Sequence, residues 1–407
     1  MYKRENLDNL LNKANYQNAD LSNSKVLVRA CLNVKIKDGV IKDRTRLDSA
    51  LPLIKELAEK SKRVVIMAHL GRPEGRDSKF SFELVRKAME DNLGEQVTML
   101  EYLDDDINKL SEDYQKDRRV FLLENIRFFE GEQSKDEEER NEFSRKLSGL
   151  GEVFINDAFP DYRPAPSTVG VVEYLPSYIG PAFMNDVKAL SKFGDPERPY
   201  IAVVGGSKLS EKVDVIDSLV EYTDKVLVGG ALVYTLLKSI GIEVGNSLIE
   251  EDKLHIAEEI MREHKDKILL PVDHVVVEEF EEPEDESGYK IIDDQAIPED
   301  KTAVDIGPQT LKIYKEKIRQ AKSVMWNGPM GVFEWKIAGR GTQEIGRTIA
   351  KNKEAFTLIG GGDCIASVHK YGIEGFDYIS NGGGAMLSFF SYDDFEILDV
   401  ILDKFEK

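Results

Sequence analysis

The hydrophobic positions of this chain form short apolar runs separated by longer stretches that mix apolar and charged residues. In the first half such runs occupy residues 25–30, 63–67, 120–123 and 153–155, and in the second half 200–204, 225–228, 323–326 and 356–359. Between them, stretches such as 44–60 repeat apolar residues at helical spacing. Buried strands that alternate with amphipathic helices predict an α/β fold with parallel sheets.

The alternation is interrupted once, over about residues 176–199, where prolines and glycines concentrate. Such a composition shift is typical of a domain boundary, and 407 residues suffice for two cores. We expect a first domain over residues 1–178, a linking helix over 179–195, a second domain over 196–388 and a helical tail over 389–407. Residues 130–150 read as one charged helix, and 278–300 as an acidic, irregular surface excursion.

Two glycine-rich loops follow neighbouring apolar runs near the end of the chain. The first is Gly360, Gly361 and Gly362, with Asp363 opening a helix, and the second is SNGGGAM at 380–386. Bare backbone at a helix start binds anions, and open α/β sheets bind ligands at the ends of their strands. We interpret the pair as a cradle for nucleotide phosphates, with an ordinary tight turn as the alternative for either loop alone.

Cationic side chains lie just beyond the predicted strands of the first half. They are His69, Arg72, Arg127 and Arg163, and Arg46 joins them from a position where a loop turns into a helix. A single arginine at such a place usually forms only a surface ion pair. A set on one rim of one sheet, in an acidic protein, instead indicates a site for a small, doubly anionic substrate, because guanidinium groups bind carboxylate and phosphate through two hydrogen bonds.

The second half adds two lysines and a glutamate to the candidate residues. Lys208 and Lys212 are four residues apart, so we expect them to share one face of a helix start with an anion between them. Glu334 follows the run at 323–326 and is a candidate acceptor for ribose hydroxyls, although an exposed glutamate is usually just a solvated charge.

Composition restricts the possible partners. With 55 Lys and Arg against 75 Asp and Glu, the net charge is −20, which argues against nucleic acid and anionic membranes. No apolar run approaches the roughly 20 residues of a membrane span, and the first residues lack a signal-peptide core. The two cysteines, Cys31 and Cys364, fit a reducing cytoplasm and have no metal-ligand spacing.

Several common nucleotide-binding motifs are missing. The chain has no G-x-x-x-x-G-K-[ST] phosphate loop and no H-R-D catalytic loop, which excludes P-loop enzymes and protein kinases. No G-x-G-x-x-G fingerprint opens a helix, which counts against a nicotinamide dehydrogenase on a similar fold.

Taken together, the motifs resemble those of the phosphoglycerate kinase family over nearly the whole chain. The stretches that carry the resemblance are DRTRL at 43–47, HLGRP at 69–73, LLENIRF at 122–128, NDAF at 156–159, VVGGSKLSEK at 203–212, WNGPMGVFE at 326–334, GGGD at 360–363 and GGGAM at 382–386. The compact length and the R-x-x-P-S ending at 163–167 look most similar to the archaeal branch.

The resemblance implies two Rossmann-like, three-layer αβα domains with parallel sheets, joined by a hinge helix, with the tail packing back on the first domain. It implies reversible phosphoryl transfer from 1,3-bisphosphoglycerate to ADP, giving 3-phosphoglycerate and ATP, with Mg²⁺ as cofactor. The partners would be these small molecules only, and the protein would be a cytoplasmic monomer of glycolysis.

The resemblance also assigns residues. Substrate binding is implied for Cys31, Asn33, Arg46, His69, Leu70, Gly71, Arg72, Arg127 and Arg163. Nucleotide binding is implied for Gly206, Lys208, Lys212, Gly230, Gly307, Asn327, Glu334, Gly361, Gly362, Asp363 and Cys364, with Asp363 at the metal. The groups around the moving phosphoryl would be Arg46, Lys208, Gly362 and Gly384.

The chain also departs from the family pattern. Cys31 stands where the family usually has the aspartate that binds the substrate hydroxyl, and the segment at 160–162 is one residue shorter than usual. Ala231, Cys364 and Asn381 replace a glycine and two hydroxyl residues. Loss of one hydroxyl contact would cost about 1–3 kcal/mol of binding. The alternative is therefore a paralogue that binds nucleotide but has weakened or altered specificity for its acid substrate.

Overall fold

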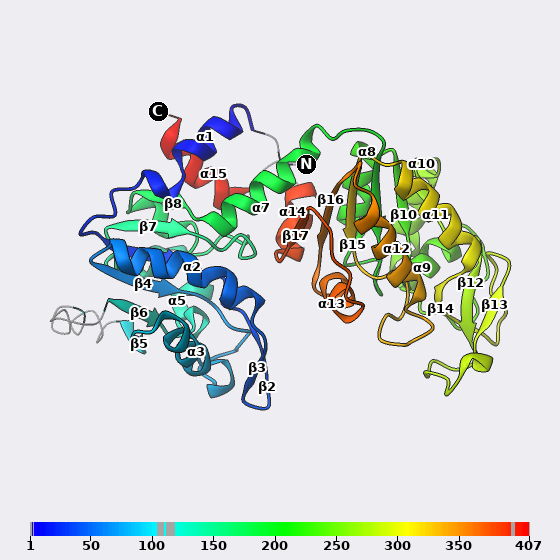
Figure 1. Ribbon diagram of the computed structural model, residues 1–407, viewed down its shortest axis with the longest axis horizontal. Coiled ribbons are helices and arrows are strands. Elements are labelled where there is room, and N and C mark those ends of the chain that lie inside the picture. The colour runs from blue at the N-terminus through cyan, green and yellow to red at the C-terminus, as the bar shows by residue number, and fades with distance from the viewer. Residues whose placement is uncertain (1, 3, 104–109, 111–118, 392–394, 407) are drawn as a thin grey trace. The chain divides into compact units, whose positions relative to one another are not determined.

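The computed structural model describes residues 2, 4–103, 110, 119–391 and 395–406, and the chain forms two compact units (Figure 1). The N-terminal unit comprises Lys3–Lys188 and Asp394–Lys407, and the C-terminal unit comprises Met1–Tyr2 and Ala189–Asp393. The chain passes from one unit to the other within helix α7, Pro181–Ser191, which falls inside the linker predicted over 179–195.

The N-terminal unit is built on a parallel sheet of six strands in the order β5-β6-β4-β1-β7-β8. The strands are β1 Lys25–Arg29, β4 Arg63–Met67, β5 Val97–Leu100, β6 Val120–Leu123, β7 Val153–Asn156 and β8 Ser177–Ile179. β1 pairs with β4 and β7, so that Arg29 lies opposite both Met67 and Asn156. All four apolar runs of the first half are strands of this one sheet, which confirms the predicted α/β class for this unit.

Helices cover the N-terminal sheet, and a small hairpin of β2 Lys35–Lys37 and β3 Val40–Asp43 precedes the second of them. The helices are α1 Leu7–Lys13, α2 Thr45–Lys60, α3 Glu83–Leu93, α5 Glu130–Gln133, α6 Glu137–Ser148 and α15 Glu396–Leu402. The single helix predicted over 130–150 is wrong. The first helix, α5, ends at Gln133, and Asp136 caps a second helix, α6. The Asp136 carboxylate accepts hydrogen bonds from the Glu138 and Glu139 amides (2.8 and 3.1 Å).

The C-terminal unit repeats the design with a parallel sheet in the order β11-β10-β9-β15-β16-β17. Its strands are β9 Tyr200–Val204, β10 Lys225–Val228, β11 Ile268–Leu269, β15 Ser323–Asn327, β16 Phe356–Gly360 and β17 Tyr378–Ser380. A second, antiparallel sheet consists of β12 His274–Val277, β13 Lys290–Ile292 and β14 Thr302–Ile306. The excursion at 278–300 is therefore only partly irregular, because it contains β13, which pairs with β12.

Helices on one face of the C-terminal sheet enclose its core. Tyr314 and Ile318 of α11, Ile345 and Ile349 of α12, and Val368 of α13 are buried with Trp326 of β15. The helices of this unit are α8 Val213–Tyr222, α9 Leu232–Ser239, α10 Leu254–His264, α11 Pro308–Gln320, α12 Arg340–Lys351, α13 Gly362–Lys370 and α14 Gly383–Ser391. None of the helices in the described part of the chain is long and apolar enough to cross a lipid bilayer.

The C-terminal residues do not form the single helix predicted over 389–407. Phe389–Ser391 close α14, and α15 is a separate helix of the N-terminal unit that lies beside β8 in Figure 1. Arg4 holds it in place, since its guanidinium pairs with Asp399 (2.5 Å), Asp403 (2.5 Å) and Glu406 (2.7 Å). Both termini of the N-terminal unit are thereby fixed to each other.

Candidate functional site

In the N-terminal unit, hydrogen bonds that meet at Gly71 bring four predicted substrate residues together. The Gly71 amide donates to the Asn33 side chain (2.9 Å), and its carbonyl accepts from Arg127. The Asn33 carbonyl in turn accepts from Arg46, in the first turn of α2 (2.8 Å). Gly71 has φ +63°, and a Cβ there would lie 2.3 Å from the Phe80 ring, so only glycine fits.

Asn125 fixes the loop that carries these residues. Its side chain accepts from the Leu70 amide (3.2 Å) and donates to the carbonyls of Leu70 (2.7 Å) and Phe80 (3.0 Å). Leu70 is buried and both of its backbone polar groups are thus bonded within the protein. Asn125 was not among the predicted site residues, and its place in the strand-end motif LLENIRF is the signal that could have identified it.

A buried ion pair lies behind the loop. Arg29, whose side chain is only 3% exposed, pairs with Asp161 at 2.7 Å, and His69 Nδ1 lies 3.2 Å from the same carboxylate. Burial opposes ionisation of Asp161, but the charge of Arg29 and the hydrogen bond from His69 outweigh it and hold the pKa of Asp161 well below its usual range. Burial lowers the pKa of His69, so we expect a neutral ring that donates to Asp161 through Nδ1.

Glu132 supports Arg29 from the other side. Its carboxylate accepts from the Ser167 amide (3.1 Å) and hydroxyl (2.6 Å), and Arg29 Nε donates to the same hydroxyl (3.1 Å). Burial raises the pKa of Glu132 to about 7 despite the nearby positive charge of Arg29. This group therefore changes its protonation near neutral pH.

The remaining cations give the cluster its charge. Arg72 and Arg163 are exposed, and Arg127 is half-buried, with its pKa lowered by burial and by the neighbouring charges of Arg29 and Arg72. We call Arg46, Arg72, Arg127 and Arg163 the arginine cluster. Asp161 pairs directly with Arg29, and the four guanidinium groups of the arginine cluster suit a small anion.

Cys31 lies at the edge of this cluster and stays protonated. Burial raises the pKa of its thiol to about 12, the charge of Asp161 acts in the same direction, and Arg46 acts against it. A neutral thiol is a weak donor and cannot replace a carboxylate as a strong acceptor. The carboxylate near this position belongs to Asp161, which the sequence analysis did not select. The lone acid in the shortened 160–162 segment was the available signal.

In the C-terminal unit, three strand-end loops fit together through bare backbone. A Cβ on Gly205 would lie 2.0 Å from the Pro329 carbonyl, and a Cβ on Gly230 would lie 2.4 Å from the Gly206 carbonyl. Gly206 and Gly230 also have φ of +134° and +73°. The loops after β9, β10 and β15 can therefore approach one another this closely only because glycine occupies these positions.

The two triple-glycine loops follow β16 and β17, which pair in parallel so that Gly360 lies opposite Ser380. This confirms that the loops end neighbouring strands. Gly362 starts α13, and a Cβ there would meet no heavy atom within 4 Å. Gly384, in the first turn of α14, is exposed. Both leave open backbone at a helix start, where an anion can bind.

A pocket of about 480 Å³ opens beside these loops. It includes four of the predicted nucleotide-binding residues, namely Gly206, Gly230, Glu334 and Asp363. Its other walls are largely apolar and include Tyr234, Leu248, Phe280, Val304, Met330 and Val332. Apolar walls with a few polar groups at one end are typical of sites for flat organic ligands such as a nucleobase with its sugar.

The helix-face prediction for the two lysines is wrong, because α8 begins only at Val213. Lys208 is exposed in the preceding turn, and Lys212 is the residue before the helix. Lys212 donates to the Asn327 side chain, and burial lowers its pKa although Glu211 and Asp363 favour its charged form. Lys208 is therefore exposed to solvent, whereas Lys212 is held at the sheet edge by its bond to Asn327.

Seven of the eleven predicted nucleotide residues do not line the pocket, and Asn327, Cys364 and Gly307 are three of them. Asn327 is buried, with its side chain bonded to Lys212 and to the Gly360 carbonyl (2.9 Å). Cys364 is buried in the core beneath α13, where burial raises the pKa of its thiol to about 12. Gly307 packs on Asp273, which leaves no room for a Cβ. Whether these residues contact a nucleotide stays a prediction.

Asp363 is the candidate ligand for a divalent cation. Within the described residues, no group of three or more His, Cys, Asp or Glu side chains is placed to hold a metal by itself. Mg²⁺ commonly uses one or two carboxylates and takes its other ligands from water and phosphate oxygens. An exposed aspartate at the glycine-lined end of the pocket fits that requirement.

Two parallel-sheet α/β units, one with the arginine cluster and one with a glycine-lined pocket, define the class as a two-domain kinase. The sequence profile of phosphoglycerate kinase matches residues 16–392. The chain belongs to the phosphoglycerate kinase family, and it is a phosphotransferase.

Individual relatives agree over nearly the full length. The chain is 39% identical over 396 residues to phosphoglycerate kinase of Dictyoglomus turgidum, covering 95% of this chain and 97% of the relative. For Clostridium perfringens the identity is 41% over 390 residues, with 93% and 96% covered. Solved structures of the enzymes from Coxiella burnetii and Pyrococcus horikoshii give TM-scores of 0.83 and 0.82 at 31% identity, covering 95% and 97% of this chain and 98% and 99% of theirs. The archaeal branch stays a prediction.

Proposed function

We propose that this kinase transfers a phosphoryl group reversibly between 1,3-bisphosphoglycerate and ADP, giving 3-phosphoglycerate and ATP. The bond between phosphorus and the acyl oxygen breaks, and a bond between phosphorus and the terminal oxygen of ADP forms. The observation that carries this proposal is the arginine cluster, in which Arg46 donates to the Asn33 carbonyl and Arg127 to the Gly71 carbonyl. Positioning and charge neutralisation suffice for this chemistry without a covalent nucleophile.

The arginine cluster would hold the acid substrate, with His69, Asn33 and the backbone of Leu70 and Gly71 shaping its floor. Arg127 and Arg163 suit the phosphate, and Arg46 suits the carboxylate end, where charge develops during transfer. Arg46 starts from the first turn of α2 and is anchored to Asn33 by one nitrogen. Its guanidinium group would then face the transferred group.

Asp161 would accept the hydrogen bond of the substrate hydroxyl in place of the aspartate that Cys31 replaces. Its Oδ2 binds Arg29 and His69, whereas no described residue bonds its Oδ1. A carboxylate held ionised inside a cationic site accepts strongly from a hydroxyl, and it repels a ligand that carries another anionic group there. Cys31 would contribute only shape and a weak donor.

In the C-terminal unit, the apolar walls would hold the nucleobase, Glu334 the ribose hydroxyls, and Gly206, Gly230, Gly361 and Gly362 the phosphates. Lys208, Lys212 and the open amides of Gly362 and Gly384 would neutralise phosphate charge. Asn327 would act through Lys212, which it positions, and Gly307 and Cys364 would shape the same edge. Mg²⁺, bound by Asp363 and phosphate oxygens, would supply further charge neutralisation.

The partners proposed are small molecules only, and the protein would work as a cytoplasmic monomer. The net charge of −20 disfavours nucleic acid and anionic membranes, and both cysteines are free thiols. Light scattering after size exclusion tests the monomer, since a mass near 46.0 kDa is expected. A stable larger mass would contradict it.

A coupled assay of ATP formation from 1,3-bisphosphoglycerate tests the activity. Turnover well above background is expected, and none with either ADP or GDP would contradict the proposal. Calorimetric titration with Mg-ADP and with 3-phosphoglycerate separately tests the two half-sites. Binding of the nucleotide without the acid would instead support a paralogue with altered acid specificity.

A further inference from the structure

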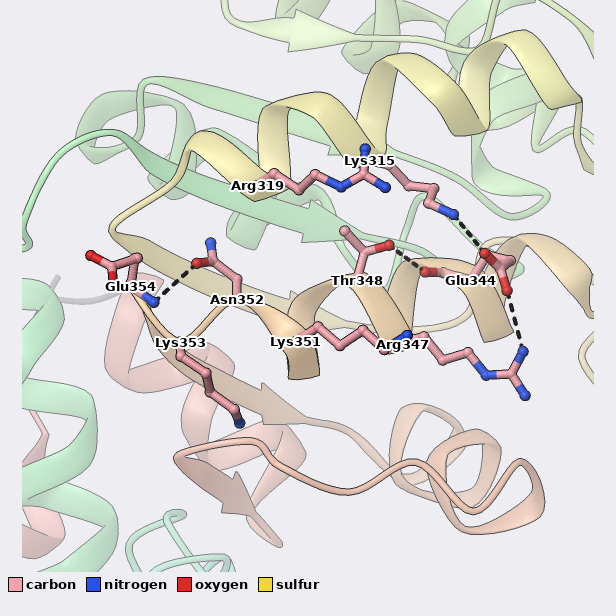
Figure 2. A pocket seen from close by; sticks show the side chains of 9 residues that line it. All are labelled: Lys315, Arg319, Glu344, Arg347, Thr348, Lys351, Asn352, Lys353 and Glu354. Atoms are coloured by element: carbon pink, nitrogen blue, oxygen red, sulfur yellow. Dashed lines mark hydrogen bonds and ion pairs between the residues drawn. The ribbon is translucent and has the colours of Figure 1, made fainter.

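A cationic groove runs between α11 and α12, formed by residues that the proposed function does not use. It has a volume of about 620 Å³ and is lined by Lys315, Arg319, Glu344, Arg347, Thr348, Lys351, Asn352, Lys353 and Glu354. Five of the nine are Lys or Arg and two are Glu, although acids outnumber bases in the whole chain. Figure 2 shows the cations coming from both helices.

The carboxylates of the groove do not neutralise it. Glu344 is shared by Lys315 (2.6 Å) and Arg347 (3.2 Å), and Glu354 pairs with Lys322, which lies outside the groove (3.1 Å). Arg319 and Lys351 have no hydrogen-bond or ion-pair partner in the part of the chain that the structure describes. The groove therefore carries surplus positive charge, which these two residues contribute from opposite helices.

The spacing of the cations lowers the stability of the protein when no anion is bound. Lys315 and Arg319 are four residues apart on α11, and Arg347 and Lys351 are four apart on α12. Like charges at this spacing repel by about 0.2–0.5 kcal/mol per pair, and here the two pairs line one groove. Attraction of cations to a helix C-terminus favours Arg319 and Lys351 at their positions, whereas Lys315 and Arg347, farther from the ends, share the single carboxylate of Glu344.

The helix ends themselves are prepared for an anion. A free helix C-terminus presents carbonyl oxygens that repel negative charge. Asn352 removes part of this effect, because its side-chain amide donates to the carbonyls of Ile318 (2.7 Å) and Ala321 (3.1 Å). The same bonds hold the end of α12 against the end of α11, so the walls of the groove are fixed relative to each other.

We propose that this groove binds an anion carrying at least two phosphate groups. One phosphate would contact Arg319 and Lys315 on α11, and another would contact Lys351 and Arg347 on α12. A ligand with two phosphate groups would thereby contact the unpartnered cations of both walls at once. The site shares no residue with the arginine cluster or with the glycine-lined pocket, so it would bind independently of the proposed reaction.

Calorimetric titration of the full chain with inorganic tripolyphosphate tests the proposal, with saturating ADP and 3-phosphoglycerate present to occupy the other anion sites. The test variant is Arg319→Glu with Lys351→Glu. The control is Lys312→Glu with Lys265→Glu, which changes the net charge equally at exposed positions of the same unit outside the groove. Wild type and control should bind one equivalent, and the test variant should lose at least about tenfold in affinity.

Equal binding by the two variants would overturn the proposal, because net charge alone would then explain the isotherm. Absence of binding to wild type would overturn it as well. Orthophosphate titrated in the same way should bind at least about tenfold more weakly than tripolyphosphate, and equal affinity would contradict the two-phosphate requirement. Both variants should keep wild-type turnover, because none of the four residues has a hydrogen-bond or ion-pair partner among the residues that the structure describes.

Discussion

Gly383 and Gly361 are in backbone contact: a Cβ on Gly383 would lie 2.8 Å from the Cα of Gly361. The loop after β17 thus supports the loop after β16, and neither has space for a side chain at that point. Gly362, one residue on, meets no heavy atom within 4 Å of a Cβ position. Adjacent glycines therefore serve different purposes, one for packing and one for access to the backbone.

Alanine substitution should separate these two purposes. Gly362→Ala should leave the melting temperature unchanged but weaken Mg-ADP binding by at least about tenfold, since the new methyl group would occupy the place proposed for a phosphate. Gly383→Ala should lower the melting temperature, because Gly361 must move. Calorimetry and thermal unfolding measure both. Full Mg-ADP affinity in Gly362→Ala would show that no phosphate approaches this residue.

Arg46→Ala should lower kcat by roughly 10³ or more with little change in stability, because Arg46 is proposed to act on charge in the transition state. Arg44→Ala is the matched control. Arg44 precedes the same helix but only pairs with Asp48 at its surface (3.2 Å), so its loss should change kcat by less than about twofold. An effect of Arg46→Ala on KM alone would indicate that Arg46 only binds the substrate and does not stabilise the transition state.

Asp161→Asn should raise the KM for 3-phosphoglycerate by about 10–100-fold, the value of one hydrogen bond to a charged group, and leave the KM for Mg-ATP unchanged. Adding Cys31→Asp should restore much of the loss by returning a carboxylate to the site. Steady-state kinetics with each substrate varied would show this.

A purely structural role for Asp161 predicts a different pattern. Glu132→Gln also removes a buried carboxylate beside Arg29, but it should leave the KM for 3-phosphoglycerate near the wild-type value. If Asp161→Asn and Glu132→Gln impair KM alike, or if Cys31→Asp restores only the melting temperature, Asp161 does not contact the hydroxyl.

The contribution of Glu132 to stability should fall as the pH rises from about 4.5 to about 7. The pKa of Glu132 is raised by burial to about 7 in the folded protein, and unfolding returns it to its ordinary value near 4.5, so the folded state holds the proton more tightly in this window. Asp157, whose pKa burial also raises to about 7, adds in the same direction. Glu132→Gln should flatten the decline in unfolding temperature between pH 5 and 8, whereas Glu130→Gln, exposed in the same short helix, should not.

Removal of Mg²⁺ with EDTA should abolish turnover, and Asp363→Asn should raise the Mg²⁺ concentration required for half-maximal rate by about tenfold or more. Asp363 is proposed as the only protein carboxylate at the metal, so the variant should still bind 3-phosphoglycerate normally. An unchanged Mg²⁺ requirement would remove Asp363 from the metal site.

The strands and the residues at their ends were predictable because a parallel sheet leaves clear marks in a sequence. Buried strands such as β4 are continuous apolar runs, and Gly71 and Arg127 follow such runs directly. Motif order then sufficed to identify the family. Both triple-glycine loops were recognised for the same reason, since no other residue type allows such close approach of backbone.

What sequence reasoning missed depends on contacts distant in the chain. The Arg29–Asp161 pair joins residues more than a hundred positions apart, and the one local signal for Asp161 is that it is the lone acid in the shortened 160–162 segment. The break before α6 was missed because the capping hydrogen bonds of Asp136 compete with the helical periodicity. Asn352, whose amide joins two helices, has an unremarkable local sequence.

The ion pairs of Arg4 with Asp399, Asp403 and Glu406 can form only late in translation, because these acids lie at the C-terminal end of the chain. The ribosome releases the first strands of the N-terminal unit early, yet α15, which completes that unit, is made after the whole C-terminal unit. The half that begins first is therefore the half that finishes last. A nascent chain halted before residue 394 would carry a C-terminal unit ready to fold and an N-terminal unit still lacking its last helix.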